Sequence, residues 1–201
     1  MNADKKAVAA YFNTLAENWD RDNAPGAGEA GRILELADIR AGGQILDVAC
    51  GTGAMFPYYL ERGVKSVTGV DISGGMIAQA EKKFEKPNVH LIQADIQACR
   101  FDEPFDRCIV FNALAHFQDY AQLMRRLAGF VKPGGRLLVA YGLSREQVNA
   151  REKDACLPEP EELAALMKPW FVVDVKQDAP YAVSGVRNDV PAPMVPPTDK
   201  R

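Results

Sequence analysis

The sequence predicts an α/β fold in which a mostly parallel sheet is covered by helices on both faces. Two observations support this prediction. Between residues 44 and 142, short apolar runs recur between stretches of helical periodicity, a pattern typical of crossover units that align strands in parallel. In addition, the first of these runs leads directly into a glycine-rich turn before the next helix begins.

The first 43 residues predict helices rather than strands. Over residues 4–19 an apolar side chain recurs every three or four positions, which predicts a helix with one apolar stripe. Small residues and glycines over 22–31 indicate a loop. A second helix around 33–37 is expected to end before the glycine pair at 42–43. Residues 1–43 are therefore expected to form an N-terminal helical segment.

Strands and helices then follow one another up to residue 141. The strand segments are short apolar runs, and the helix segments place apolar residues on one face. One helix is expected to end near Pro87, and another at the Lys-Pro-Gly-Gly sequence of residues 132–135. The predicted strands are 44–49, 66–70, 89–93, 105–111 and 136–141, and the predicted helices are 55–61, 76–84 and 121–131.

After Gly142 the chain predicts two helices and then a strand pair. Ser144 and Gln147 have the spacing of a capping box, which begins the first helix. The two strands are joined by a short connection, so they are expected to pair antiparallel. Residues 188–201 hold four prolines and predict a disordered tail, which leaves 44–187 as the core domain. The predicted elements are a helix at 144–151, a loop at 156–159, a helix at 161–167 and strands at 171–176 and 181–187.

Composition excludes several classes of function. The chain has 201 residues, 47% of them hydrophobic and 25% charged, which fits one globular domain. A net charge of −3 lacks the basic footprint of a nucleic-acid-binding protein. No apolar stretch approaches the ~20 residues of a membrane span, and no signal sequence is evident. The four cysteines are scattered, so neither a disulfide framework nor a metal site is expected. These features predict a cytoplasmic protein without a membrane partner.

The glycine-rich turn after the first strand points to a nucleotide-like ligand. Gly51 and Gly53 let the backbone turn and approach a ligand closely. Asp71 ends the second strand 18 residues beyond Gly53, where an acid suits the two hydroxyls of a ribose. Asp47, at the end of the first strand, adds a carboxylate beside the turn. The segment therefore predicts a site for a ribose-containing ligand.

Two common nucleotide motifs do not fit this turn. A dinucleotide site requires a third glycine for close packing of the helix against the strand, and Phe56 occupies that position. A phosphate-binding loop of the Gly-Lys-Ser/Thr type is absent. A ligand with a ribose and a charged amine, but no phosphate, fits better.

Five segments, at ordered positions, resemble the motifs of class I S-adenosylmethionine-dependent methyltransferases. The resemblance covers residues 44–142 nearly continuously, and its one departure is that Ala49 replaces the first glycine of the first motif. It implies a Rossmann-like, doubly wound sheet of seven strands in the order 3-2-1-4-5-7-6, with strand 7 antiparallel. The matching segments are Asp47-x-Ala49-x-Gly51-x-Gly53, Asp71, Gln93–Ile96, Phe105–Asn112 and Lys132–Leu137.

The resemblance also implies a cofactor, S-adenosyl-L-methionine, and a set of residues that bind it. Asp71 would hold the ribose, and Asp95 would accept from the adenine amino group. Asn112 would face the methionine part. The N-terminal segment, with Tyr11 or Trp19, would fold over the site as a lid, although the cluster of Tyr11, Phe12 and Trp19 could equally be the core face of a terminal helix. The implied cofactor-binding residues are Trp19, Asp47, Ala49, Gly51, Thr52, Gly53, Asp71, Ile72, Met76, Asp95, Ile96 and Asn112.

His116 is the candidate catalytic residue. It follows the fourth strand, where the family's methyl acceptor faces the cofactor, and an imidazole can take a proton near neutral pH. It could equally form a wall of the pocket. Asp119 could orient His116, but its position favours the N-cap of the next helix. Methyl transfer mainly requires proximity and orientation, so no catalytic triad is needed.

The predicted function is methyl transfer by in-line displacement to a small-molecule acceptor, in a monomer or homodimer. The short connection between the fourth and fifth strands leaves no room for a domain that would bind a macromolecule. Alternatives are a non-catalytic protein that binds S-adenosylmethionine or S-adenosylhomocysteine, a quinone-type methyltransferase, and a metalloid-type methyltransferase that would use Cys156. A nicotinamide oxidoreductase is disfavoured by Phe56.

Overall fold

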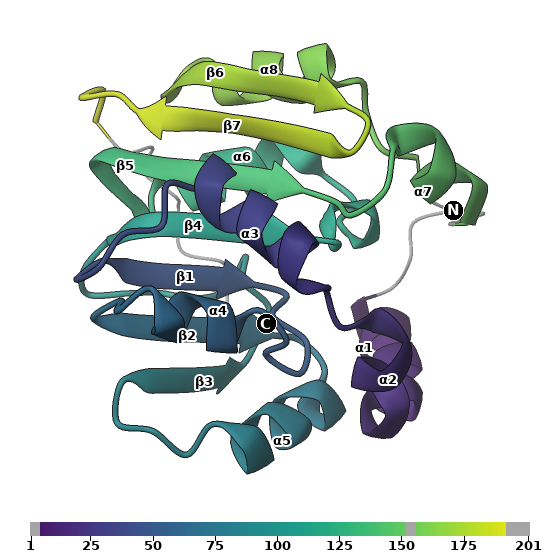
Figure 1. The fold of residues 1–201 in the computed structure, drawn as a ribbon. Coiled ribbons are helices and arrows are strands. Elements are labelled where there is room, and N and C mark those ends of the chain that lie inside the picture. The colour runs from purple at the N-terminus through teal and green to yellow at the C-terminus, as the bar shows by residue number, and fades with distance from the viewer. Residues whose placement is uncertain (1–4, 152–155, 192–201) are drawn as a thin grey trace, which may run out of the picture.

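The computed structural model describes residues 5–151 and 156–191 and contains one seven-stranded sheet (Figure 1). The strand order is β3-β2-β1-β4-β5-β7-β6. β7 runs antiparallel to both of its neighbours, β5 and β6, and the other paired strands are parallel, so the predicted topology is confirmed. The strands are β1 Gln44–Val48, β2 Ser66–Asp71, β3 Val89–Gln93, β4 Phe105–Phe111, β5 Val131–Ala140, β6 Phe171–Asp178 and β7 Tyr181–Arg187.

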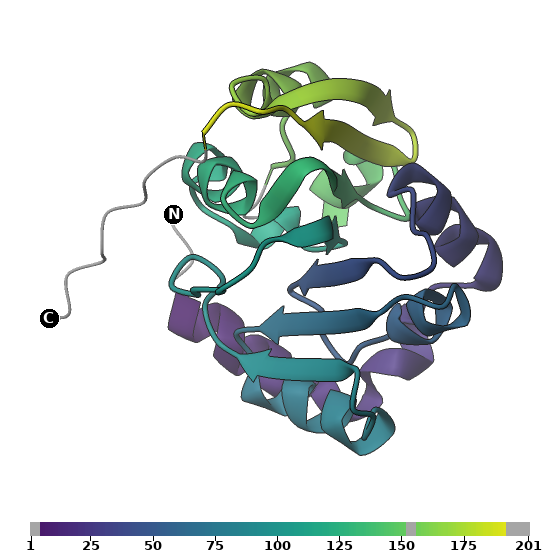
Figure 2. The same cartoon turned by 90° about the vertical axis from the view of Figure 1, so that its left-hand side faces the viewer.

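The helices pack on the two faces of this sheet (Figure 2). On one face, Ile33 of α3 and Phe56 of α4 are fully buried against β1 and β2. On the other, Leu127 of α6 and Leu163 of α8 pack against β4, β5 and β7. The described helices are α1 Lys5–Leu15, η1 Ala16–Asn18, α2 Trp19–Asn23, α3 Ala27–Leu36, α4 Phe56–Glu61, α5 Gly74–Lys83, η2 Leu114–His116, α6 Tyr120–Ala128, α7 Arg145–Arg151 and α8 Pro160–Met167.

The central strands bring their carboxyl ends to one edge of the sheet. Val48 at the end of β1 is in register with Val70 of β2 on one side and with Val110 of β4 on the other. The chain winds from β1 toward β3 in one direction and from β4 toward β5 in the other, so a crevice forms where the winding reverses. Ligands of open α/β sheets bind in this crevice.

The predicted loop at 22–31 is confirmed only over 24–26, because α2 extends to Asn23. α3 begins at Ala27, with Gly26 as its N-cap, although glycines at 28 and 31 disfavour a helix. Ala30 is fully buried on this helix, and its packing against the core outweighs the low helix propensity of its neighbours.

The predicted helix at 121–131 also runs too far. α6 ends at Ala128, and β5 already begins at Val131, which pairs with Phe105. The register then shifts before Arg107 pairs with Arg136, and Gly134 has a φ of 75°. A strand with such an irregularity lacks the regular alternation that sequence patterns detect.

Two N-caps predicted after the fourth strand, Ser144 and Asp119, are confirmed. Ser144 N–H donates to Gln147 Oε1 at 3.0 Å, and Gln147 N–H donates to Ser144 Oγ at 3.2 Å, which is a capping box. Asp119 caps α6 by accepting from Gln122 N–H at 2.8 Å. Of the predicted tail, residues 192–201 lie outside the described part of the chain. No described helix is long and apolar enough to cross a membrane.

Candidate functional site

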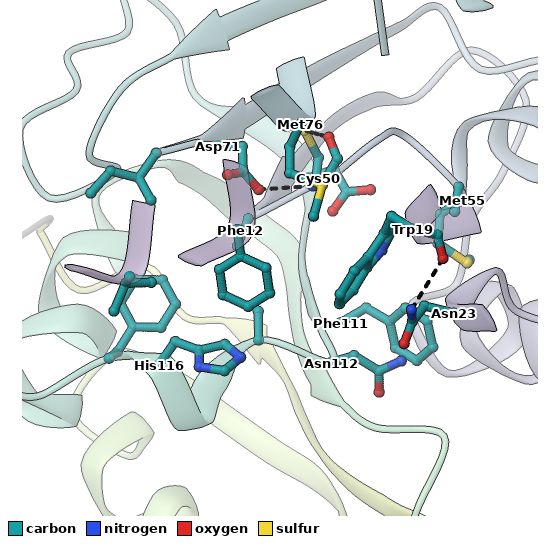
Figure 3. A pocket seen from close by; sticks show the side chains of 18 of the residues that line it. Phe12, Trp19, Asn23, Cys50, Met55, Asp71, Met76, Phe111, Asn112 and His116 are labelled. Atoms are coloured by element: carbon teal, nitrogen blue, oxygen red, sulfur yellow. Dashed lines mark hydrogen bonds between the residues drawn. The ribbon is translucent and has the colours of Figure 1, made fainter. Parts of the chain in front are cut away.

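A cavity of about 450 Å³ opens at the carboxyl ends of β1, β2, β4 and β5, and α1 and α2 lie over it (Figure 3). Among the predicted cofactor residues, only Thr52 and Gly53 do not line it. His116 lines it too. The fold therefore brings residues from distant parts of the chain together around one candidate pocket. The predicted residues that line it are Trp19, Asp47, Ala49, Gly51, Asp71, Ile72, Met76, Asp95, Ile96, Asn112 and His116.

The turn after β1 alternates between ordinary and left-handed backbone. Ala49, Gly51 and Gly53 have φ values of 54°, 56° and 77°. Ala49 therefore adopts a left-handed conformation that strains an alanine and that a glycine would adopt without strain. This geometry matches the glycine positions of the first motif, including the one that is substituted here.

Asp71 links this turn to the neighbouring strand. Its Oδ2 accepts from Gly51 N–H at 2.8 Å, and its Oδ1 accepts from Ser73 N–H at 2.8 Å. The side chain is 8% exposed, and burial raises its pKa, an effect that the two N–H donors and the nearby His116 oppose. Because a carboxylate has about four acceptor positions, these donors leave it acceptor capacity for a ribose hydroxyl.

Asp47 is more deeply buried, at 3% exposed. Burial raises its pKa to about 7, the neighbouring Asp71 adds to this, and the Tyr59 hydroxyl opposes it. The charge of this carboxyl group near neutral pH therefore depends on what occupies the cavity, because a bound cation would favour the ionised form.

Asp95 already has partners from within the protein. Lys5 Nζ of α1 lies 2.6 Å from its Oδ2, and Gln97 N–H donates to its Oδ1 at 3.0 Å. The second contact is the turn that commonly follows a strand. An adenine amino group would therefore share this carboxylate with Lys5.

Thr52 and Gly53 do not line the cavity, but their contacts hold the neighbouring elements of the site together. The Thr52 hydroxyl donates to Asp20 of α2, whose other oxygen lies 2.6 Å from Lys83 Nζ. A Cβ on Gly53 would lie 2.9 Å from the Phe84 ring, so only glycine fits there.

Further contacts join the N-terminal helices to the core, and sequence patterns did not reveal them. Asn13 Oδ1 accepts from the Ser73 hydroxyl at 2.7 Å and from Gly75 N–H at 2.8 Å. The Phe12 ring meets His116 edge to face, with centroids 5.0 Å apart, and Trp19 at 5.6 Å (Figure 3). Polar residues on an amphipathic helix give no sign of which distant group they contact.

His116 sits in the short helix η2, which Tyr141 holds in place. Ala115 N–H donates to the Tyr141 hydroxyl at 2.7 Å, and both residues are buried. Tyr141 is the first residue after β5, so β5 fixes the loop that follows β4. In the part of the chain that is described, no group of three or more acidic, histidine or cysteine side chains could hold a metal ion.

Comparison with known proteins agrees with this geometry. Residues 45–135 match the family model described as a methyltransferase domain. This match and the motifs at the ends of the strands support a class I S-adenosylmethionine-dependent methyltransferase. The fold is also that of N-methyltransferase NodS from Bradyrhizobium japonicum in complex with S-adenosyl-L-homocysteine, with a TM-score of 0.73 and 17% identity over 93% of this chain and 100% of that one.

Curated methyltransferases are similar over part of their length. The chain is 29% identical to a malonyl-[acyl-carrier protein] O-methyltransferase of Acetivibrio thermocellus, over 67% of this chain and 48% of the relative. It is 28% identical to a demethylmenaquinone methyltransferase of Staphylococcus haemolyticus, over 68% of this chain and 61% of the relative. The chain thus spans about half the length of the first curated relatives that it matches.

Proposed function

We propose that this methyltransferase-family chain binds S-adenosylmethionine in the cavity and transfers its methyl group to a small-molecule acceptor. The observation that carries the proposal is the pairing of Asp71 with the left-handed turn after β1. One buried carboxylate stabilises the turn and still faces the cavity with acceptor positions for a ribose.

The residues along the cavity suit the successive parts of this cofactor. Ile72, Met76 and Ile96 offer apolar side chains for an adenine near the ends of β2 and β3. Asp71 would hold the ribose. Asp47 and Asn112, at the ends of β1 and β4, would face the methionine part, and the buried carboxyl group of Asp47 suits its positive charge.

When bound, the cofactor supplies a methyl group that is activated by a sulfonium. The protein must then align an acceptor atom with the methyl carbon and keep water away. As the carbon–sulfur bond breaks and the new bond forms, an acceptor that carries a proton must lose it. We propose His116 as the base that takes this proton, since its imidazole lines the cavity beyond Asn112.

The N-terminal helices would act as a lid over the bound cofactor. Besides the contact of Phe12 with His116, their contacts to the core include three polar ones at separate points: Lys5 to Asp95, Asn13 to Ser73, and Asp20 to Lys83. The two ion pairs are exposed, and exposed ion pairs are individually weak, on the order of 1 kcal/mol or less. Such a segment can open to admit a ligand and close again.

Calorimetric titration with S-adenosylmethionine tests the proposal. Asp71→Asn is expected to weaken binding by about tenfold or more. The control is Asp106→Asn, because Asp106 also accepts a backbone N–H, from Gln44 at 2.8 Å, but lies at the amino end of β4, opposite the cavity. Urea unfolding of both variants shows whether each is folded. Absence of binding to the wild type, or equal affinity of the two variants, would refute the proposal.

A further inference from the structure

The cavity continues past the predicted cofactor residues to the end of β5. Glu29, from the first turn of α3, lies there against Gly142, the second residue after β5. A Cβ added to Gly142 would overlap Glu29 Oε1, so the carboxylate occupies the space that any other residue at 142 would fill. Asn112 closes the same corner, because its Oδ1 accepts from Gly142 N–H at 3.0 Å.

Glu29 is half-buried, and no hydrogen bond or ion pair reaches its carboxylate from any described residue. The nearest cation along α3 is Arg32, whose electrostatic interaction with Glu29 is longer than an ion pair. The Arg32 guanidinium instead donates through Nη2 to the carbonyl of Tyr141 at 2.7 Å. A carboxylate withdrawn from water without a donor is unfavourable, and a ligand that brings a donor relieves this cost.

Glu29, on α3, lies at the end of β5, away from the strands whose ends would hold the adenosine. The residues proposed for adenine, ribose and methionine follow β3, β2, β1 and β4 in that spatial order. β5 is the next strand, two strand spacings or about 10 Å beyond β1. His116, the proposed base, follows β4 between these two regions. Glu29 therefore lies where a methyl acceptor, rather than the adenosine, would bind.

We infer that this β5-end subsite, made by Glu29 and Gly142 and bordered by Asn112 on the side of the cofactor, binds the methyl acceptor, and that Glu29 selects acceptors with a protonated amine. The inference rests on the proposed function. A half-buried carboxylate attracts an ammonium group strongly because screening by water and salt is reduced there. It would repel an acceptor that brings its own carboxylate to this point.

Arg151 also lines the cavity, whereas Arg32, which donates to the carbonyl of Tyr141, does not. Arg151 ends α7 and is exposed at the rim, so solvent weakens its field more than that of Glu29. An acceptor with an anionic group farther from its amine would still be accommodated. Glu29 therefore determines which charged group of an acceptor the subsite accepts beside Gly142.

Two variants remove the carboxylate in different ways. Glu29→Gln keeps the shape and deletes the charge. Gly142→Ala keeps the charge and displaces the side chain, which is flexible enough to move away from the added methyl group. Glu35→Gln is the matched control, since Glu35 lies on the same helix and pairs with Arg62 at 3.2 Å on the surface.

The experiment measures binding of phenethylamine and of 3-phenylpropanoate to each protein saturated with S-adenosylhomocysteine. The wild type and Glu35→Gln are expected to prefer the amine. In Glu29→Gln and Gly142→Ala the amine should bind about tenfold more weakly, and the preference should vanish or reverse. No preference in the wild type, or a preference that survives in both variants, would overturn the inference.

The amino group of the cofactor is the alternative source of the cation. Titration with S-adenosylhomocysteine and with 5′-methylthioadenosine, which lacks the amino acid, distinguishes the two. If Glu29→Gln weakens binding of the first but not of the second, Glu29 holds the cofactor and the acceptor assignment is wrong. Equal affinity of wild type and variant for each compound supports the acceptor subsite. Failure of the wild type to bind either compound would refute the proposed function itself.

Discussion

The ring of Phe56 lies against Gly69: a Cβ built on Gly69 would come within 2.6 Å of the Phe56 Cζ and 2.8 Å of the Cys50 sulfur. Phe56 begins α4 directly after the left-handed turn, and Gly69 lies in β2 beside Asp47 of β1. In dinucleotide-binding folds a third glycine on the helix permits close packing against the strand. Here the glycine is on the neighbouring strand, and the helix contributes a fully buried ring.

Gly69→Ala is therefore expected to destabilise the protein by about 1–3 kcal/mol, because the added methyl group overpacks a buried contact. Urea unfolding measures the loss. Gly28→Ala is the control, since a Cβ at Gly28 would meet nothing within 4 Å and replacing a helical glycine with alanine stabilises. Wild-type stability of Gly69→Ala would show that Phe56 and Cys50 can move aside without cost.

Ala49→Gly is expected to stabilise the free protein. Ala49 has a φ of 54°, a conformation that costs a residue with a Cβ about 1–2 kcal/mol. The added freedom of glycine in the unfolded chain removes about 0.5–1 kcal/mol of this gain. Ala54→Gly, five residues on and without a positive φ, should only lose stability. If both variants lose stability equally in urea unfolding, the strain at Ala49 is not significant.

The fold could be predicted largely from the sequence, because buried parallel strands are short apolar runs and the intervening helices have a different period. The two errors have one cause. At Ala27 and at Val131, the start of an element depends on packing or pairing with a distant partner, Val131 with Phe105 for example, and not on local propensity.

The residues of the site also divide into those that the sequence could predict and those that depend on distant contacts. Asp47 and Asp71 could be predicted because the end of a buried strand is a position visible in the sequence. The partners of α1 could not, since Lys5 and Asp95 are 90 positions apart. Glu29 was missed for a similar reason: on a helix next to Gly28 it resembles any solvent-facing acid until the end of β5 is brought against it.

Tyr141→Phe is expected to loosen the loop that carries His116. The variant leaves the buried Ala115 N–H without its acceptor, which costs about 1–3 kcal/mol. The chain has only two histidines, so the ring protons of His116 can be followed by NMR with His90 as an internal reference. The His116 signal should shift or broaden while that of His90, on β3, stays unchanged. An unchanged His116 signal would mean that Tyr141 does not position it.

The raised pKa of Asp47 predicts that the free energy of unfolding depends on pH between about 4 and 7. Its folded-state pKa of about 7 lies above the ordinary value of 3.8, so between these values the folded protein holds a proton that the unfolded chain releases. Stability should therefore fall as the pH rises from about 4 to about 7. Asp47→Asn removes this slope and is expected to raise the stability at pH 8 by up to about 4 kcal/mol. Parallel stability curves for the two proteins between pH 4 and 8 would contradict this.

The same carboxyl group should couple cofactor binding to proton release. A sulfonium near Asp47 favours the ionised form, so S-adenosylmethionine should expel a proton at pH 6.5, where part of the population is still protonated. S-Adenosylhomocysteine has a neutral sulfur and should expel less. Calorimetry in two buffers with different enthalpies of ionisation measures the protons released. Asp47→Asn should lose the difference between the two ligands, because an amide has no proton to give up in this range. A difference that persists in Asp47→Asn would assign the titrating group elsewhere, with Asp71 as the next candidate because burial raises its pKa as well.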